Sequence, residues 1–416
     1  MIFFSRHDIR RGLVLLGVAA AAGCSTAAPA QQSAGVVVPG IEVLLRDSLP
    51  LVRGKRVGLI TNQSGRDRSG RSDIDLLYHA PGVKLVALFA PEHGIRGTAE
   101  AGAKIASDTD AETGVPIYSL YGAVHAPTPA MLDSVDVLLY DIQDAGARFY
   151  TYVWTMALSA DAAGRARVPF VVLDRPDPIR GDRVEGGVLD TAYRSFVGEY
   201  PVALRYGLTP GELLRYLVGT GQVHADVHVV PMEGWRRSMW YDATGLPWVD
   251  PSPNLRSQDA LALYPGTVLF EGTNLSEGRG TEAPFQLVGA GWLTDAGAIA
   301  RELNLLNMGG VRFDSTSRTI APGQKWGGET IPMLHVTVTD DDRVQPVQVA
   351  AYMLQVIRRR HPGDFKWVLP HLDELAGSDA VRKAVDAGTV AELLPKLQAQ
   401  SEAFERATRS YLLYDR

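Results

Sequence analysis

The sequence predicts an α/β fold with a parallel central sheet, and three observations support this prediction. Short runs that are apolar along nearly their whole length recur between residues 56 and 174, as strands buried on both faces require. Segments with the apolar spacing of amphipathic helices lie between these runs. Each run ends in polar or ionisable residues. Strands that alternate with helices in this way are typical of βαβ units, and therefore of a parallel sheet.

The predicted elements follow in order along the chain. The four apolar runs are RVGLIT (56–61), VKLVALFA (83–90), VDVLLYD (135–141) and VPFVVLD (168–174). The helical patterns between and after them are SDIDLLYHA, TPAMLDS and FYTYVWTMALSADAAG, and the last of these ends at a glycine. Thr209, Pro210 and Glu212 form a strong helix start as N-cap, N1 and N3 residues. DVHVVPM (226–232) predicts a further strand.

The second half of the chain predicts a smaller α+β region. The segment YPGTVLFEGTNLS predicts a strand that runs into a polar, glycine-rich loop. Such a loop is either a solvated turn or a ligand site, because glycine allows the backbone to approach a ligand closely. Beyond residue 300, MLHVTVTD predicts a strand, and VQVAAYMLQVIRRRH and TVAELLPKLQAQSEAFERATRSYLLY predict helices. The loop carries five candidate residues: Glu271, Asn274, Glu277, Arg279 and Glu282.

The polar residues at the strand ends predict a binding cleft. In parallel sheets ligands bind beyond the carboxyl ends of the strands. The residues at these ends are Asn62, Gln63, Glu92, His93, Asp141, Gln143, Asp144, Asp174 and Arg175. The sequence has no GxGxxG or GxxxxGK[ST] loop, no GxSxG elbow and no HExxH motif. Its net charge of −6 argues against a nucleic-acid surface. We therefore expect neither nucleotide nor nucleic-acid binding, and no metal or other cofactor.

The N-terminus has the features of an export signal. Arg6, Arg10 and Arg11 precede an apolar run of about a dozen residues, which is the size of a signal-peptide core. Cys24 follows in AAGC and resembles the lipidated cysteine of a bacterial lipoprotein, although ordinary secretion and twin-arginine export remain alternatives. We predict a signal peptide over 1–23, a tether over 24–40, and a periplasmic protein with a lipid anchor, in the outer membrane because Ser25 follows the cysteine.

Several motifs together resemble one known family. They are GLITNQSG (58–65), LFAPEHGIRG (88–97), TGVPIYSLYG (113–122), DIQDAGARFYTY (141–152), VLDRPDPIRGDRVEG (172–186), FVGEYPVALRYGLTPGEL (196–213), DPSPNL (250–255) and YPGTVLFEGTNLSEGRGTEAPF (264–285). In this order they resemble the NamZ-type exo-β-N-acetylmuramidases, a glycoside hydrolase family formerly catalogued as a domain of unknown function. The resemblance covers the chain from about residue 36 onward.

The resemblance implies a fold, an activity and a set of site residues. It implies a Rossmann-like domain (41–255), a smaller C-terminal subdomain (256–416) and an active site in the cleft between them. It also implies release of N-acetylmuramic acid from the non-reducing ends of peptidoglycan fragments, without a metal. Glu92 matches the glutamate proposed as catalytic, with Tyr152 and Glu282 as the assisting tyrosine and carboxylate. The substrate-binding residues that follow from the same motifs are Asn62, His93, Arg96, Asp144, Arg148, Tyr150, Asn274, Glu277 and Arg279.

The chemistry of these residue types agrees with glycoside hydrolysis. A carboxylic acid must protonate the leaving oxygen, and apolar neighbours such as Phe89 and Pro91 would favour the protonated form of Glu92. The lactyl carboxylate of muramic acid needs a cationic partner, for which Arg96, Arg148 and Arg279 are the candidates.

Three points stay open from sequence. His93 either orients the site or satisfies a turn carbonyl. Tyr118 and Tyr121 stack on the sugar or pack the core, whereas Trp154 is better explained as core. The alternative functions are an inactive, lipid-anchored muropeptide-binding protein and an exo-hexosaminidase of other specificity. The sequence indicates no protein partner.

Overall fold

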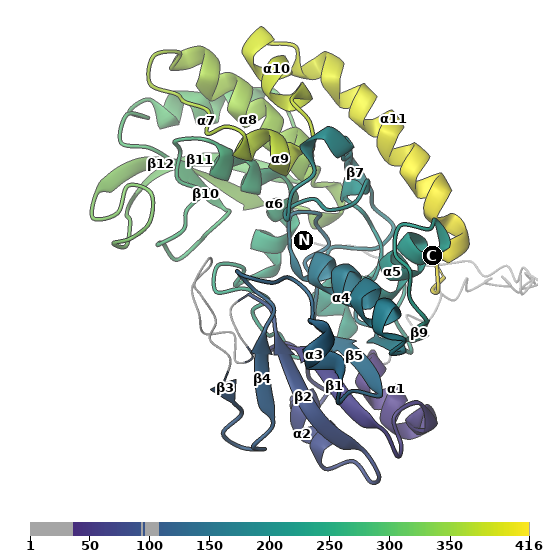
Figure 1. The fold of residues 1–416 in the computed structure, drawn as a ribbon. Coiled ribbons are helices and arrows are strands. Elements are labelled where there is room, and N and C mark those ends of the chain that lie inside the picture. The colour runs from purple at the N-terminus through teal and green to yellow at the C-terminus, as the bar shows by residue number, and fades with distance from the viewer. Residues whose placement is uncertain (1–35, 93–94, 96–107, 416) are drawn as a thin grey trace, which may run out of the picture. The chain divides into compact units, whose positions relative to one another are not determined.

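The central element of the fold is a mostly parallel sheet (Figure 1). The computed structural model describes residues 36–92, 95 and 108–415. Within them, seven strands form this sheet in the order β3-β4-β2-β1-β5-β6-β9, and only β3 runs antiparallel to its neighbour. The strands are β1 (Arg56–Thr61), β2 (Lys84–Ala90), β3 (Asp108–Thr109), β4 (Pro116–Ser119), β5 (Val137–Asp141), β6 (Phe170–Leu173) and β9 (Val227–Val230).

Helices cover both faces of this sheet, because successive side chains of a strand point to opposite faces. Leu59 and Leu139 pack on one face with residues of α1 and α2. Ile60 and Tyr140 pack on the other face with residues of α4 and α5. The helices of this half are α1 (Gly40–Asp47), α2 (Asp73–Tyr78), α3 (Pro129–Leu132), α4 (Tyr152–Ala166) and α5 (Pro210–Gly219). The parallel α/β fold predicted from the apolar runs is therefore confirmed.

The strand order contains a topological switch point. The chain passes from β1 outward through β2 to β4, then returns to the other side of β1 and continues through β5, β6 and β9. At the switch point the ends of β1 and β5 lie side by side, with Thr61 paired with Asp141. In open α/β sheets the crevice at such a point is the usual ligand site.

The C-terminal part is an α+β arrangement built on a three-stranded antiparallel sheet of order β10-β12-β11 among the described residues. A hairpin of β7 (Glu185–Val188) and β8 (Ala203–Arg205) precedes it in sequence and packs against α11. The strands of the three-stranded sheet are β10 (Leu287–Gly289), β11 (Val311–Thr319) and β12 (Thr330–Val338). Its helices are α6 (Gln258–Thr267), α7 (Ala296–Leu305), α8 (Pro346–Arg360), α9 (His371–Ala376), α10 (Ala380–Ala387) and α11 (Val390–Thr408).

One predicted strand is wrong. The segment 264–272 forms the end of α6 and a following 3₁₀ turn, η4 (Val268–Gly272), instead of a strand. The side chain of Ser257 caps α6 by accepting a hydrogen bond from the backbone N–H of Ala260, and the Ala-Leu-Ala-Leu stretch that follows favours a helix. Residues 260–267 are all buried, and a helix buried on all sides has the same unbroken apolar pattern as a buried strand.

Gly164 does not end α4 as the sequence suggested, because the helix continues to Ala166. A Cβ atom at Gly164 would lie 1.9 Å from the backbone oxygen of His224, so glycine is needed there for close packing. By contrast, the predicted start of α5 is confirmed: Thr209 and Glu212 form a reciprocal capping box and Pro210 occupies the first turn.

The domain boundary and the N-terminal export signal stay predictions. Residues 35–416 cluster as one compact unit, and the domain boundary at residue 255 stays a prediction. Cys24, the signal peptide and most of the tether lie outside the described residues. Along the part of the chain that the structure describes, no helix combines the length and apolar character needed to cross a membrane.

Candidate active site

Glu92 lies directly beyond the carboxyl end of β2, next to the switch point. The strand before it is buried, and Phe89 and Pro91 are both shielded from solvent, whereas Glu92 itself is only partly buried. The hydroxyl of Tyr121 donates a hydrogen bond of 3.0 Å to Oε1 of Glu92, and the Thr151 hydroxyl lies 3.5 Å from Oε2. The carboxyl group is thus held from both sides, and the residue as a whole keeps part of its surface exposed.

Tyr152 supports the backbone beneath this carboxyl group. It is the first residue of α4, and its hydroxyl donates to the backbone oxygen of Glu92 at 3.1 Å. Burial and the charge of Glu92 raise the pKa of the Tyr152 hydroxyl above its ordinary value, so it stays a donor across the physiological pH range. The adjacent ring of Tyr150 lies edge-on at 4.7 Å, and its hydroxyl donates to the backbone oxygen of Pro251 at 2.6 Å. Tyr152 therefore holds the backbone of Glu92, and Tyr150 links this region to the 250–255 loop.

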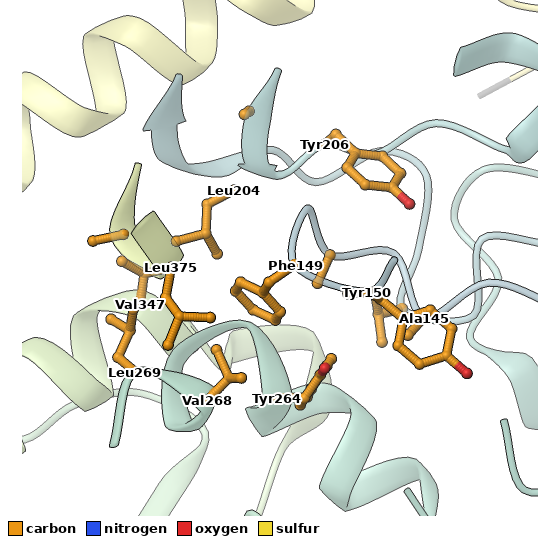
Figure 2. Close-up of a cluster of buried hydrophobic side chains, with 14 of the residues drawn as sticks. Ala145, Phe149, Tyr150, Leu204, Tyr206, Tyr264, Val268, Leu269, Val347 and Leu375 are labelled. Atoms are coloured by element: carbon orange, nitrogen blue, oxygen red, sulfur yellow. The ribbon is translucent and has the colours of Figure 1, made fainter. Parts of the chain in front are cut away.

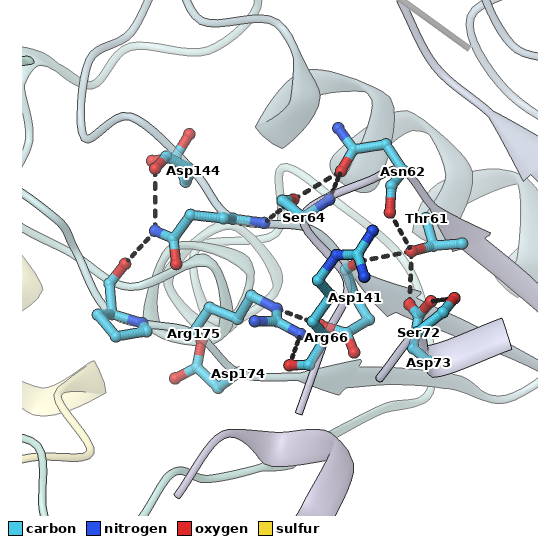
Figure 3. A network of polar contacts seen from close by, with 12 residues as sticks. Thr61, Asn62, Ser64, Arg66, Ser72, Asp73, Asp141, Asp144, Asp174 and Arg175 are labelled. Carbon is cyan, nitrogen blue, oxygen red and sulfur yellow. Dashed lines mark hydrogen bonds and ion pairs between the residues drawn. The ribbon is translucent and has the colours of Figure 1, made fainter. Parts of the chain in front are cut away.

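Asn62, directly after β1, lies near the Tyr152 hydroxyl. Figure 3 shows its side chain next to Ser64. Its Oδ1 accepts hydrogen bonds from the backbone N–H and the hydroxyl of Ser64, at 2.9 and 2.6 Å. Its Nδ2 is buried and has no hydrogen-bond partner among the residues that the structure describes. The Asn62 amide opposes the rise in the pKa of the Tyr152 hydroxyl, so it is directed toward the group that supports Glu92.

Most other strand-end residues are part of the core rather than of a binding surface, which corrects the expectation that they line a cleft (Figure 3). Asp141 is fully buried and forms an ion pair with Arg175. Burial raises the pKa of Asp141, and the charge of Arg175 opposes this shift. Asp174 is also fully buried and accepts hydrogen bonds from Thr209 and from the backbone N–H of Gly211. These groups join the strand ends to the loops that follow them.

Asp144 and Arg148 follow the same pattern. Neither side chain has exposed surface. Asp144 accepts hydrogen bonds from the Tyr206 hydroxyl and from the backbone N–H of Gly146, and burial raises its pKa to about 6. Arg148 donates to the backbone oxygens of Val202 and Leu375, and burial lowers its pKa to about 9. In this conformation neither residue reaches a substrate directly, so both position the surrounding loops.

Aromatic rings connect the Glu92 region to the second half of the chain (Figure 2). Tyr264 on α6 lies edge-on to Phe149 at 5.0 Å and to Tyr150 at 6.3 Å between ring centroids. On its other side, the ring of Phe285 lies 4.8 Å away. Tyr264 thus lies between the loop that carries Tyr150 and the glycine-rich loop.

The glycine-rich loop holds a cluster of charges. Arg279 donates to Oε1 of Glu271 at 2.6 Å and pairs through Nε with Glu277 at 3.1 Å. Lys325 pairs with Oε2 of Glu277 at 3.2 Å. Burial alone would lower the pKa of Arg279, but the charges of Glu271 and Glu277 outweigh it and raise that pKa. The loop is therefore an ordered ion-pair network, not a freely solvated turn.

Asn274 and Glu282 lie in less favourable places for chemistry. The Asn274 side chain donates to the backbone oxygen of Asp364 and accepts from the N–H of Lys366, so its amide joins two loops. Glu282 has 63% of its side chain exposed and pairs with Arg318 on β11. The ion pair with Arg318 lowers the pKa of Glu282, which opposes a role as a proton donor.

Two predicted site residues, His93 and Arg96, lie outside the described residues. Among residues 36–92, 95 and 108–415, no three His, Cys, Asp or Glu side chains are grouped to hold a metal ion. Trp154 is core, as its sequence context indicated: it is fully buried and its ring N–H donates to the backbone oxygen of Arg148.

Sequence reasoning assigned no site role to Thr151, Tyr264 and Lys325, and it left Tyr121 open between stacking on the sugar and packing the core. Tyr121 lies within TGVPIYSLYG and Thr151 within DIQDAGARFYTY, so the family motifs contained them. Nothing in the sequence distinguishes a tyrosine that contacts Glu92 from one that packs beside Phe89, as Tyr118 does. Lys325 has no signal of its own, because its partners are mostly backbone oxygens.

Comparison with known proteins places both parts of the chain in one family. The profile described as "Exo-beta-N-acetylmuramidase NamZ, N-terminal" matches residues 57–259, and the corresponding C-terminal profile matches residues 262–414. The chain belongs to the NamZ family. Members of this family include the peptidoglycan β-N-acetylmuramidase NamZ of Bacillus subtilis strain 168. The chain is 41% identical to it over 406 residues, which is 97% of this chain and 98% of that protein.

Two solved structures resemble this NamZ-family chain. Both are DUF1343 family proteins from Bacteroides fragilis NCTC 9343. The first has a TM-score of 0.84 and 36% identity, and the alignment covers 91% of this chain and 99% of that one. The second has a TM-score of 0.72 and 30% identity with the same coverage.

Proposed function

We propose that this chain is an exo-acting glycosidase that releases N-acetylmuramic acid from the non-reducing ends of peptidoglycan fragments, in cell-wall turnover. The observation that carries the proposal is the partly buried Glu92, whose carboxyl group Tyr121 holds beyond β2 and next to the switch point. Identity of 41% with the Bacillus subtilis β-N-acetylmuramidase over nearly the full length supports the choice of sugar.

Glu92 acts as the general acid in this proposal. Its protonated carboxyl group transfers a proton to the glycosidic oxygen while the bond between that oxygen and C1 of the muramic acid breaks. A water molecule then adds its hydroxyl to C1, and its second proton restores the acid. The products are free N-acetylmuramic acid and the shortened saccharide. Tyr152 and Tyr121 keep the carboxyl group in place through its backbone oxygen and Oε1.

The test is the variant Glu92→Gln on a chromogenic β-muramide. Glutamine keeps the shape but cannot donate the proton, so kcat should fall by about 10²- to 10⁴-fold. A matched control is Glu329→Gln, at an exposed glutamate directly before β12. A folded Glu92→Gln protein, checked by its melting temperature, that turned over at near the wild-type rate would refute the assignment.

The same assay separates the alternative functions. The wild-type protein is given the β-muramide and the corresponding N-acetylglucosaminide side by side. Faster release from the muramide supports the proposal, and faster release from the glucosaminide indicates a hexosaminidase instead. Tight muropeptide binding without any product after long incubation indicates a binding protein.

We also propose that the chain is exported to the periplasm and anchored through a lipid on Cys24, with the outer membrane favoured. The arginines before the apolar run and the AAGC sequence support this proposal. In cells, Cys24→Ala should move the protein from the membrane fraction to the soluble periplasmic fraction and abolish its labelling by a clickable fatty acid. Equal labelling of the two proteins would refute lipidation.

A further inference from the structure

Arg279 is an arginine whose guanidinium is held in a fixed orientation but not fully used. Its Nη2 and Nε are committed to Glu271 and Glu277. Its Nη1 has no hydrogen-bond partner among the described residues, and 19% of the side chain remains exposed. A guanidinium held in place through Nε and Nη2 can use its Nη1 N–H groups with little loss of side-chain freedom on binding.

The charge balance around Arg279 allows it to accept a further anion. Glu271 and Glu277 carry two negative charges, and Lys325 supplies a second positive charge at 3.2 Å from Glu277. His371 lies 3.7 Å from the other oxygen of Glu271. The two carboxylates are therefore matched by two cations before any ligand binds.

The ring of Phe285 forms a platform for Arg279. The guanidinium carbon lies 5.1 Å from the ring centroid, a cation–π distance. The backbone of Phe285 has a φ of 64°, in the left-handed region that is unfavourable for a bulky side chain. Such strain is found mostly where a binding site needs a particular orientation.

Tyr264 places Arg279 in relation to Glu92. Its ring packs against Phe285 on one side and against Tyr150 on the other, and Tyr150 in turn contacts Tyr152. The charges of both Arg279 and Glu92 act on its hydroxyl. That hydroxyl makes no hydrogen bond within the described part of the chain, although only 7% of the residue's surface is exposed.

Of the two arginines proposed from sequence that the structure describes, Arg279 is the better placed. Arg148 has no exposed surface and is bonded to backbone oxygens, and Arg96 lies outside the described residues. Lys325, the nearest other cation, donates to four backbone oxygens and to Glu277.

We propose that Arg279, together with the hydroxyl of Tyr264, binds the lactyl carboxylate of muramic acid and so sets the preference for muramic acid over glucosamine sugars. This inference rests on the proposed function. Arginine suits this role because a charged guanidinium N–H and a carboxylate form a strong, directional hydrogen bond. Glucosamine sugars lack the lactyl group and would leave Arg279 without this partner.

The experiment compares a chromogenic β-muramide with its lactyl methyl amide, which has nearly the same shape but no charge. The wild type should prefer the free acid by on the order of 30-fold in kcat/KM. In Arg279→Met this preference should nearly disappear, with the loss confined to the free acid. Arg312→Met is the control, because Arg312 is an exposed arginine of β11 that pairs with Asp314.

Arg279→Met removes the cation between Glu271 and Glu277, and the repulsion between these carboxylates could unfold the variant. Two further variants therefore test the same role with a smaller change in charge or structure. Arg279→Lys keeps the positive charge and should retain part of the preference. Tyr264→Phe removes only an unpartnered hydroxyl and should reduce the preference by about 5-fold. An equal loss on acid and amide in the folded variants, or an unchanged preference, would overturn the role of Arg279.

A failure of the proposed function gives a different result. If the wild type hydrolyses neither compound, the hydrolase proposal fails, and calorimetry decides the role of Arg279 by itself. N-acetylmuramic acid and its lactyl methyl amide are then titrated into the wild type and into Arg279→Lys. A preference for the acid that shrinks in the variant supports the inference, and equal binding of both sugars overturns it.

Discussion

At the scale of single residues, hydroxyl groups organise the carboxyl group of Glu92. Tyr121 contacts one carboxyl oxygen, Thr151 approaches the other, and Tyr152 holds the backbone oxygen. The hydrogen bond from Tyr121, at 3.0 Å, is the shorter of the two contacts to the Glu92 carboxyl group. Burial and the charge of Glu92 raise the pKa of Tyr121 to about 12, so it remains a donor throughout any practical assay range.

Tyr121→Phe tests this positioning role. Removal of the donor should lower kcat/KM by about 10-fold, with most of the change in kcat. Tyr118→Phe is the control, since Tyr118 packs against Phe89 without contacting Glu92 in the structure. An equal loss of rate in the two folded variants, or a loss confined to KM, would argue against positioning by Tyr121.

A second prediction at this scale concerns the buried carboxyl group of Asp177. It is fully buried, accepts one hydrogen bond from the N–H of Ile179, and its Oδ2 has no partner among the described residues. Burial raises its pKa to about 8, although the charge of Arg205 opposes the shift. Its carboxyl group therefore holds a proton in the folded state at a pH where the unfolded chain has released it.

The stability of the protein should consequently fall as pH rises from about 4 to 8, by up to about 1.4 kcal/mol per pH unit from this group. Asp177→Asn should flatten that part of the profile, measured as the free energy of urea unfolding at pH 5 and pH 8. Asp144 and Asp174, whose pKa values burial raises to about 6 and about 7, act in the same direction. Because these two groups also contribute to the slope, the effect of Asp177 is read from the difference in slope between Asp177→Asn and the wild type. Identical slopes would contradict the assignment.

At the scale of secondary-structure elements, Lys325 organises the turn that follows α6. Its ammonium group donates to the backbone oxygens of Phe270, Glu271, Thr273 and Leu275, at 3.1 to 3.2 Å. A helix end and a tight turn leave backbone oxygens with few partners, and the three N–H donors of one ammonium group are shared here among four such oxygens and Glu277. The same ammonium pairs with Glu277, so turn and charge cluster form one unit.

Lys325→Met should lower the free energy of unfolding by about 2 kcal/mol, because Glu277 keeps only Arg279 as its ion-pair partner. Water can replace part of the lost bonding, since Lys325 is partly exposed. Thermal unfolding of the variant is compared with that of Lys366→Met, at an exposed lysine of a neighbouring loop. Equal melting temperatures for the two variants would show that the turn does not depend on Lys325.

At the scale of the whole molecule, the C-terminal tail ties the two halves of the chain together. The Tyr414 hydroxyl donates to Oδ2 of Asp174 at 2.6 Å and accepts from the N–H of Met232 at 3.0 Å. The N–H of Leu413 donates to Glu212, which also pairs with the buried Arg237. The last residues therefore complete a polar network that lies at the end of β6 and the start of α5.

Tyr414→Phe should lower the free energy of unfolding by about 1–2 kcal/mol, because it leaves a buried carboxyl group and a backbone N–H each short of one partner. Urea unfolding measures the change, and Tyr78→Phe, at an exposed tyrosine of α2, serves as its control. If Tyr414→Phe matched this control, the tail would not stabilise the molecule.

Much of the parallel sheet followed from the sequence, and so did the start of α5. The apolar runs at 56–61 and 135–141 correspond closely to β1 and β5, because strands buried on both faces must be apolar throughout. The capping residues of α5 act locally and were predictable for that reason. The segment 264–272 failed because a helix buried on all sides shows no periodicity to distinguish it from a strand.

By itself, the sequence determined the class of fold, the family and the place of Glu92 at a strand end. These depend on local patterns and ordered motifs. Only the tertiary structure decided which strand-end residues are enclosed, because burial depends on segments distant in sequence. Asp141 and Arg148 are enclosed by their partners, while Arg279 keeps part of its side chain exposed. Tyr121 and Tyr264 could not be singled out for the same reason: the chain brings them near Glu92 and Arg279 only once it has folded.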